Sequence, residues 1–221
     1  MKVCSVNGCN GKHCGLGFCK KHYNQYKRHG HILERTVFDT NNIIEYEDYA
    51  EVIMYNKAGE EVGRAIIDLD DVELVSKYKW YMDKDGYAQN HIVGKLHRFI
   101  IDCPSDMVVD HINHNTLDNR KINLRICTQA ENSKNRGKRK NCSSQYKGVS
   151  LNKKANKWTA LIYINDKRKY LGLFDNEYDA SVAYDKSAIM YYREYAYLNH
   201  SIENYIDYIL ELGLDIDNFI R

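Results

Sequence analysis

The sequence has a single proline, Pro104, and no apolar run that approaches the ~20 residues of a membrane-spanning helix. Its first residues, Met1-Lys2-Val3-Cys4, do not resemble a secretory signal peptide. The scarcity of proline and the 28% of charged residues indicate a folded protein with few linkers. We therefore expect a cytoplasmic protein with no membrane partner, whose 221 residues form one large domain or two to three small ones.

Disulfide bonds are also not expected, because the chain has an odd number of cysteines, seven, and cytoplasmic thiols stay reduced. Residues near the N-terminus have a spacing typical of a zinc site, Cys4-x4-Cys9-x9-Cys19-x2-His22. Three thiolates and one imidazole bind Zn²⁺ tetrahedrally, and the ion would stabilise a segment too short to form a core. His13 and Cys14 lie in the same segment and compete as ligands.

The net charge of +2 conceals a strong asymmetry along the chain. Residues 1–31 carry six Lys/Arg and no acidic residue, and residues 133–170 carry twelve Lys/Arg and one acidic residue. Residues 32–132 and 171–221 are acidic, with net charges of −8 and −7. The second basic segment is interleaved with tyrosine and tryptophan. Two such segments indicate that the protein binds a polyanion through both basic segments. The alternative, that these lysines and arginines are only solvated surface residues, is less favoured.

Hydrophobic patterning predicts a modular α+β protein. Short strands are expected over 51–55 and 62–67, and a short helix begins in the acidic run 68–71. Asp85-Gly86 is typical of a hairpin turn. Residues 96–101 are apolar at helical spacing, so we expect a helix there.

The second half of the chain begins with two expected strands, over 107–112 and 124–127, joined by a long polar loop. Thr128 and Glu131 form a capping box, which predicts a helix from Gln129. The expected organisation is a zinc-binding motif at 1–31, a central domain at 45–136, a basic linker at 137–143, a domain of two or three strands and a helix (about 177–193) at 144–199, and a C-terminal helix at 200–221 that packs on the domain before it.

A cluster of polar residues surrounds the end of the first of these two strands. Asp110 and His111 place a carboxylate beside an imidazole, and two carboxamides follow, Asn123 just before the second strand and Asn132 after it. Hydrolysis of a phosphodiester requires a base for the attacking water and a cation for the charge on the phosphate. The cluster offers both.

The central segment resembles the HNH endonucleases of the phage and intron-encoded homing type. The resemblance covers about 40 residues, extends to about 90 with the upstream strands, and implies a ββα-metal fold. The residues that carry it are Gly94-Lys95-Leu96-His97-Arg98, Val109-Asp110-His111-Ile112-Asn113, Leu117-Asp118-Asn119-Arg120, Asn123-Leu124-Arg125 and Thr128-Gln129-Ala130-Glu131-Asn132.

The resemblance implies a role for each polar residue of the cluster. His111 would deprotonate the attacking water, and Asn123 would orient the imidazole. Asp110 and Asn132 would bind Mg²⁺ or Mn²⁺, with no small-molecule cofactor. With one active centre, a monomer that nicks one strand is expected, in the host cytoplasm if a phage encodes the protein. Double-strand cleavage would require dimerisation or sequential cuts. Nothing suggests that the zinc ion is catalytic.

The next segment resembles the ethylene-response-factor (APETALA-type) DNA-binding domain over about 55 residues. The residues that carry it are Tyr146-Lys147-Gly148-Val149, Lys157-Trp158-Thr159-Ala160, Tyr170-Leu171-Gly172-Leu173-Phe174, Asp179-Ala180, Ala183-Tyr184-Asp185 and Leu198-Asn199. Such domains place a three-stranded sheet in the major groove of DNA, with a helix behind it. Leu161 and Tyr163 replace charged residues of the family pattern, which weakens arginine-to-guanine readout.

Double-stranded DNA is therefore the expected partner. The predicted DNA-binding residues are Lys138, Arg139, Lys147, Lys153, Lys154, Lys157, Arg168 and Lys169.

Two other functions fit parts of the sequence. A non-catalytic, sequence-specific DNA-binding regulator would retain the flanking modules, but the polar cluster of the centre is intact. A protein directed at RNA is less favoured, because a sheet suits the wide major groove of B-DNA better than the narrow groove of duplex RNA. Arg120 and Arg125 have two equal interpretations, an ion pair with Asp118 or contacts to phosphate.

Overall fold

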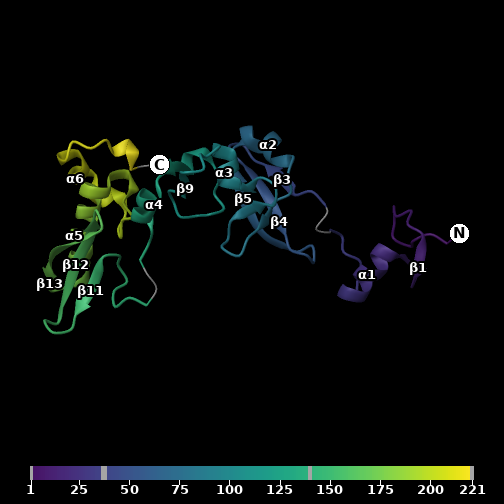
Figure 1. Ribbon diagram of the computed structural model, residues 1–221, viewed down its shortest axis with the longest axis horizontal. Coiled ribbons are helices and arrows are strands. Elements are labelled where there is room, and N and C mark those ends of the chain that lie inside the picture. The colour runs from purple at the N-terminus through teal and green to yellow at the C-terminus, as the bar shows by residue number, and fades with distance from the viewer. Residues whose placement is uncertain (1, 36–38, 139–140, 220–221) are drawn as a thin grey trace. The chain divides into compact units, whose positions relative to one another are not determined.

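The computed structural model describes residues 2–35, 39–138 and 141–219. Contacts along the chain divide it into two units, each made of small antiparallel sheets and short helices (Figure 1). The first unit contains the residues up to Ile100 together with Asn115–Lys121, and the second contains Ile101–His114 and the residues from Ile122 onward. The mixed α and β composition agrees with the prediction. In the described residues no helix is long and apolar enough to cross a membrane.

The N-terminal motif is a short hairpin followed by a helix. Its strands β1 (His13–Gly15) and β2 (Phe18–Cys19) pair antiparallel, and α1 (Lys20–His29) begins directly after Cys19. The helix ends at Gly30, which adopts the left-handed conformation (φ 77°) that costs glycine no steric strain.

The first unit has its apolar core between two three-stranded sheets and their helices. Alternate residues of β4, Ala50, Val52 and Met54, are fully buried and pack around Trp80 and Leu96. The elements are β3 (Asn42–Glu45), β4 (Ala50–Tyr55), β5 (Glu61–Ile67), η1 (Leu69–Asp71), α2 (Val72–Ser76), β6 (Tyr81–Met82), β7 (Ala88–Asn90), β8 (Gly94–Lys95) and α3 (Leu96–Ile101). The predicted hairpin at Asp85-Gly86 joins β6 to β7.

Residues 115–121 of the predicted polar loop bond to β5 of this unit. The backbone N–H of Ile66 donates to the carbonyl of Leu117 at 2.8 Å, and the N–H of Asn119 donates to the carbonyl of Ile66 at 2.8 Å. Lys121 forms an ion pair with Asp71, with 2.7 Å between Nζ and Oδ1. The middle of the loop is therefore fixed to a strand more than 45 residues earlier in the sequence.

The second unit begins with a hairpin and a helix at the predicted positions. Strands β9 (Val108–His111) and β10 (Leu124–Cys127) pair antiparallel, and α4 (Gln129–Asn135) follows. The capping box between Thr128 and Glu131 is formed and fixes the start of the helix.

The C-terminal domain is a three-stranded sheet with a long helix on one face (Figure 1). Its elements are β11 (Val149–Asn152), β12 (Lys157–Ile164), β13 (Lys167–Phe174) and α5 (Glu177–Tyr192). Ala160 and Ile162 of β12 are buried against α5. Gly148 has a φ of 76° and would place a Cβ 1.9 Å from the Tyr184 ring, so a larger residue does not fit there.

The last segment packs on α5, as predicted for the stretch after residue 200. Its elements are η3 (Arg193–Tyr195), η4 (Ile202–Tyr205), α6 (Ile206–Glu211) and η5 (Ile216–Asn218). Ile189 of α5 and Ile209 of α6 are fully buried in their shared core. The buried Asp185 carboxylate accepts bonds from the backbone N–H of Asn199 and the hydroxyl of Tyr205, both at 2.9 Å, which fasten this segment.

Candidate functional site

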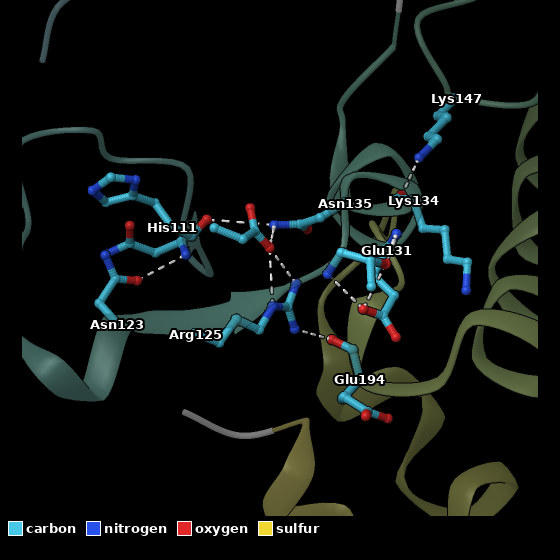
Figure 2. Close-up of polar contacts among 11 residues, drawn as sticks. His111, Asn123, Arg125, Glu131, Lys134, Asn135, Lys147 and Glu194 are labelled. Carbon is cyan, nitrogen blue, oxygen red and sulfur yellow. Dashed lines mark hydrogen bonds and ion pairs between the residues drawn. The ribbon is translucent and has the colours of Figure 1, made fainter. Parts of the chain in front are cut away.

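The Asp110 carboxylate of the predicted site accepts hydrogen bonds from two side chains, Arg125 and Asn135, which Figure 2 labels. The strand register places Asp110 opposite Arg125, whose Nε and Nη2 donate to its Oδ2 at 2.9 and 2.6 Å. The side chains of the pair are only 7% and 11% exposed. Such a buried pair needs further hydrogen bonds to offset desolvation, and Asn135 Nδ2 supplies one to the same oxygen at 2.8 Å.

His111 is buried at the end of β9, opposite Leu124 in the strand pairing. Asn123 stabilises the backbone that follows it. The Asn123 carbonyl accepts from the N–H of Ile112 at 2.9 Å, and its Oδ1 accepts from the N–H of Asn113 at 2.9 Å (Figure 2). The structure therefore brings Asp110, His111 and Asn123 together, and these Asn123 bonds act on the main chain beside His111. A contact from Asn123 that orients the imidazole stays a prediction.

The carboxamide that meets Asp110 is Asn135, three residues after the predicted ligand Asn132. Asn135 is buried at the end of α4, and its Nδ2 also lies 3.4 Å from the His111 carbonyl. Asn132 is half-buried one turn earlier, with its backbone N–H bonded to Thr128. Residues three apart share a helix face. That spacing is the signal in the sequence that could have identified Asn135 as a second candidate.

Arg125 was also missed as a site residue, and it contacts two parts of the second unit. Its Nη1 donates to the backbone carbonyl of Glu194, and its guanidinium lies 4.6 Å from the centroid of the Tyr195 ring. Both residues belong to η3 of the C-terminal domain. The sequence left two interpretations for Arg125, an ion pair with Asp118 or contacts to phosphate. Arg125 does form an ion pair, but with Asp110. The Asp118 carboxylate pairs with Arg120.

The donor set of this cluster fits a hard divalent cation. Asp110 offers carboxylate oxygen, and the two asparagines of α4 carry carboxamide oxygens, which are the ligand types that Mg²⁺ and Mn²⁺ take. Few protein ligands would leave coordination positions for phosphate oxygens.

His114 lies nearby, with its ring centroid 5.2 Å from that of Tyr197. Partial burial lowers the pKa of its imidazole, and the negative charge of Asp110 opposes this shift.

A second group of side chains lies in the N-terminal motif and can hold a metal ion. The four ligand atoms lie within 4.8 Å of one another. In a tetrahedral zinc site, bonds of about 2.3 Å to sulfur and 2.0 to 2.1 Å to nitrogen separate two sulfurs by about 3.8 Å and a sulfur and a nitrogen by about 3.6 Å. Here Cys9 Sγ is 3.8 Å from Cys19 Sγ, and Cys19 Sγ is 3.6 Å from His22 Nδ1. The members are Cys4, Cys9, Cys19 and His22.

The competing ligands lie outside this group. Cys14 is exposed, and His13 Nε2 accepts a bond from the backbone N–H of Gly17 at 3.2 Å. Although burial raises the pKa of the Cys4 thiol, hydrogen bonds from the Cys19 backbone and from His22 outweigh it and lower that pKa to about 6. Cys4 is therefore readily available as the thiolate that a metal binds.

The predicted DNA-binding residues fall into two groups. Lys153, Lys154 and Arg168 are exposed at β11–β13, as is Lys169, which bonds Tyr191. Lys157 pairs with Asp175 at 2.8 Å. Exposed Tyr163 and Tyr170 lie on the sheet face away from α5. The second group lies beside the basic linker and contains Lys138, Arg139 and Lys147. Lys138 donates to the Ser144 carbonyl, and Arg139 lies outside the described residues.

Lys147 is largely enclosed rather than presented on the sheet. Its ammonium donates to the backbone carbonyl of Lys134, at the end of α4, at 2.5 Å (Figure 2). Burial lowers the pKa of Lys147 to about 8. This placement favours a structural role over a phosphate contact.

Comparisons with known proteins find one family model and several relatives that are similar to parts of this chain. Residues 102–134 match the family model described as HNH endonuclease. A protein of Acanthamoeba polyphaga mimivirus, named as an uncharacterized HNH endonuclease, is 44% identical over 107 residues, which are 44% of this chain and 55% of that protein. An APETALA2-like protein 2 of Oryza sativa subsp. indica is 37% identical over 65 residues, or 29% of this chain and 15% of that protein.

An ethylene-responsive transcription factor of Arabidopsis thaliana is similar at 36% identity over 73 residues, 32% of this chain and 17% of that protein. No solved structure matches the chain. The chain thus spans about half of the viral relative and under a fifth of each plant relative. The family match and the viral relative confirm the predicted likeness to HNH endonucleases, and the likeness to APETALA-type proteins is partial and weaker.

Proposed function

We propose that this chain, with its HNH segment at residues 102–134, is a metal-dependent endonuclease that hydrolyses a phosphodiester of duplex DNA. One observation carries the proposal: the matched segment folds as a hairpin and helix in which Asp110 and His111, consecutive residues of β9, are both buried. A carboxylate fixed by two neighbours, next to a buried imidazole, has the composition that metal-assisted hydrolysis needs.

Each residue of the site has a distinct task in this proposal. His111 accepts the proton of the attacking water, since an imidazole is basic enough near neutral pH. Asn123 stabilises the backbone around it. Asp110 and a carboxamide of α4, Asn132 or Asn135, hold Mg²⁺ or Mn²⁺, which would supply positive charge at the phosphate. The products are a 5′-phosphate and a 3′-hydroxyl.

The two ends of the chain bind the DNA on either side of this reaction. The N-terminal motif holds Zn²⁺ structurally and presents the basic helix α1, and the C-terminal domain, which resembles ethylene-response-factor domains, contributes Lys153, Lys154 and Arg168. Both ends attract the phosphate backbone. We further propose a monomer of the homing type that nicks one strand at a time in the cytoplasm.

Supercoiled plasmid DNA tests the proposal. With Mg²⁺ present, the wild-type protein should convert supercoiled circles into nicked circles, and EDTA should stop the conversion. Agarose gels of a time course measure it. Tight DNA binding without nicking under any metal would leave the non-catalytic DNA-binding regulator as the function. Cleavage of duplex RNA but not DNA would favour the RNA-directed alternative.

Replacing Lys153, Lys154 and Arg168 together by glutamine should weaken DNA binding more at low salt than at high salt. Each cation that no longer neutralises a phosphate reduces the slope of log K against log salt by about 0.9, so removing three cations reduces it by about 2 to 3. Fluorescence anisotropy with a labelled duplex at several KCl concentrations measures the slope. A matched control replaces three exposed lysines of the acidic segment 32–132, Lys57, Lys77 and Lys84, by glutamine and should leave the slope unchanged. Equal slopes for the wild type and the first triple variant would remove the C-terminal sheet from the DNA interface.

A further inference from the structure

We propose that the C-terminal domain (residues 144–219) completes the nuclease site, with Arg125 as the positioning residue through which η3 holds the Asp110 carboxylate. The inference rests on the proposed function, and it assigns to this domain a second role besides DNA binding. Three contacts of one guanidinium carry it (Figure 2).

All three nitrogens of the Arg125 guanidinium are engaged, on two sides. Nε and Nη2 bond the Asp110 carboxylate, at 2.9 and 2.6 Å, whereas Nη1 bonds the Glu194 carbonyl. The guanidinium is planar and rigid, so fixing Nη1 fixes the direction of the other two donors. An arginine that only neutralised Asp110 would not need the third bond. The position of the carboxylate therefore depends on the position of η3.

The C-terminal domain supplies a rigid support at this point. The guanidinium carbon lies over the Tyr195 ring, 4.6 Å from its centroid, at a distance where cation–π attraction operates. Arg193 begins η3 with a φ of 52°, which a non-glycine residue adopts only where its surroundings impose it. The preceding helix α5 is anchored by the fully buried Ile189. The turn that presents Glu194 and Tyr195 is thus set by the domain core.

The same domain also fixes the second partner of Asp110. Lys147 Nζ donates to the Lys134 carbonyl, one residue before Asn135. A cation at the carboxyl end of a helix satisfies a carbonyl that has no partner within the helix and is favoured by the helix dipole. Asn135 donates to Asp110 Oδ2 at 2.8 Å. Both side chains that position the carboxylate are thereby attached to the C-terminal domain.

We expect the affinity of the site for metal to fall when the contacts between η3 and Arg125 are removed. A guanidinium released from Tyr195 and Glu194 rotates with the carboxylate it binds, so Asp110 no longer presents its oxygens in one direction. Outer partners of metal ligands typically contribute about 10- to 100-fold to affinity. We expect the Kd for Mn²⁺ to rise about 10-fold in Tyr195→Ala.

The test measures binding of Mn²⁺ to the full chain, loaded with zinc beforehand, by electron paramagnetic resonance of the free ion. Asp110→Asn identifies the binding that belongs to this site. Tyr195→Ala should weaken that binding about 10-fold, and Tyr195→Phe, which keeps the ring, should restore it. Tyr195→Leu keeps apolar volume without the ring's charge distribution and should bind as weakly as the alanine variant. Tyr208→Ala removes a ring of the same domain that lies over Lys186 and should have no effect.

The outcomes separate the inference from the proposed function. Unchanged Mn²⁺ affinity in both Tyr195→Ala and Tyr195→Leu would overturn the inference and leave the nuclease proposal standing. A phenylalanine variant as weak as the alanine variant would also overturn it, because the ring would not be the support. If the wild type shows no Mn²⁺ binding that depends on Asp110, the metal site itself is wrong, and both proposals fall.

Discussion

His111→Ala is expected to slow plasmid nicking by about 10²- to 10⁴-fold while the affinity for DNA stays the same. The imidazole is the group proposed to accept the proton of the attacking water, and without it water must be deprotonated by solvent. His111 is buried on β9, so it contributes to the reaction rather than to the exposed surface that attracts DNA. Single-turnover rates with Mg²⁺ and excess protein measure the chemical step, and anisotropy with a labelled duplex measures binding.

A histidine of the other unit provides the control for this experiment. His91 is exposed, its ring centroid lies 4.6 Å from that of Tyr81, and it lies outside the matched HNH segment, so His91→Ala should nick at the wild-type rate. A rate for His111→Ala within about threefold of the wild type would exclude His111 as the base, since general bases contribute at least about 10²-fold. His114 would then be the next candidate, because its imidazole lies close enough to Asp110 for that carboxylate to influence it.

Cys19→Ala is expected to abolish zinc binding by the N-terminal motif and to unfold it. Cys19 is buried where β2 meets α1, and its sulfur lies beside both Cys9 and His22. Structural zinc sites contribute about 10 to 16 kcal/mol to such small motifs, far more than a short hairpin and one helix supply by themselves. Mass spectrometry of the native protein should find one zinc ion per wild-type chain and none per variant chain. Amide hydrogen exchange over residues 13–29 should become fast.

Cys14→Ala is the matched control, because Cys14 lies in the same hairpin but is exposed and outside the ligand group. It should retain one zinc ion and slow exchange. Loss of zinc in Cys14→Ala with retention in Cys19→Ala would show that the ligand set differs from the one proposed. Nicking activity should respond to Cys19→Ala only through weaker DNA binding, because the ion is proposed to be structural.

Local patterns predicted the elements around the site well. The capping box at Thr128 and Glu131 predicted the start of α4, and the strand expected over residues 124–127 is β10. The capping box and the strand pattern each depend on residues at most four positions apart, so both can be recognised in the sequence alone. The ligand spacing of the N-terminal motif likewise predicted a group that the structure brings together.

The partners of Asp110 depend on information that is not local. In a hairpin with a two-residue turn, the turn sets the strand register, but here twelve residues separate β9 from β10. The sequence therefore left Asp118 and phosphate as equal partners for Arg125. Its contacts with Glu194 and Tyr195 join residues about 70 positions apart. Such contacts follow from the packing of α4 against η3, which no motif records.

The attachment of residues 115–121 to β5 has a consequence for how this protein can be rearranged. The chain passes between its two units three times, after Ile100, His114 and Lys121. A gene fusion that exchanged the first unit at a single junction would remove β5, the strand to which the loop between β9 and β10 is hydrogen-bonded. Exchange of the first unit between relatives therefore requires both of its segments to change together, so recombination should preserve the pair as one inherited block.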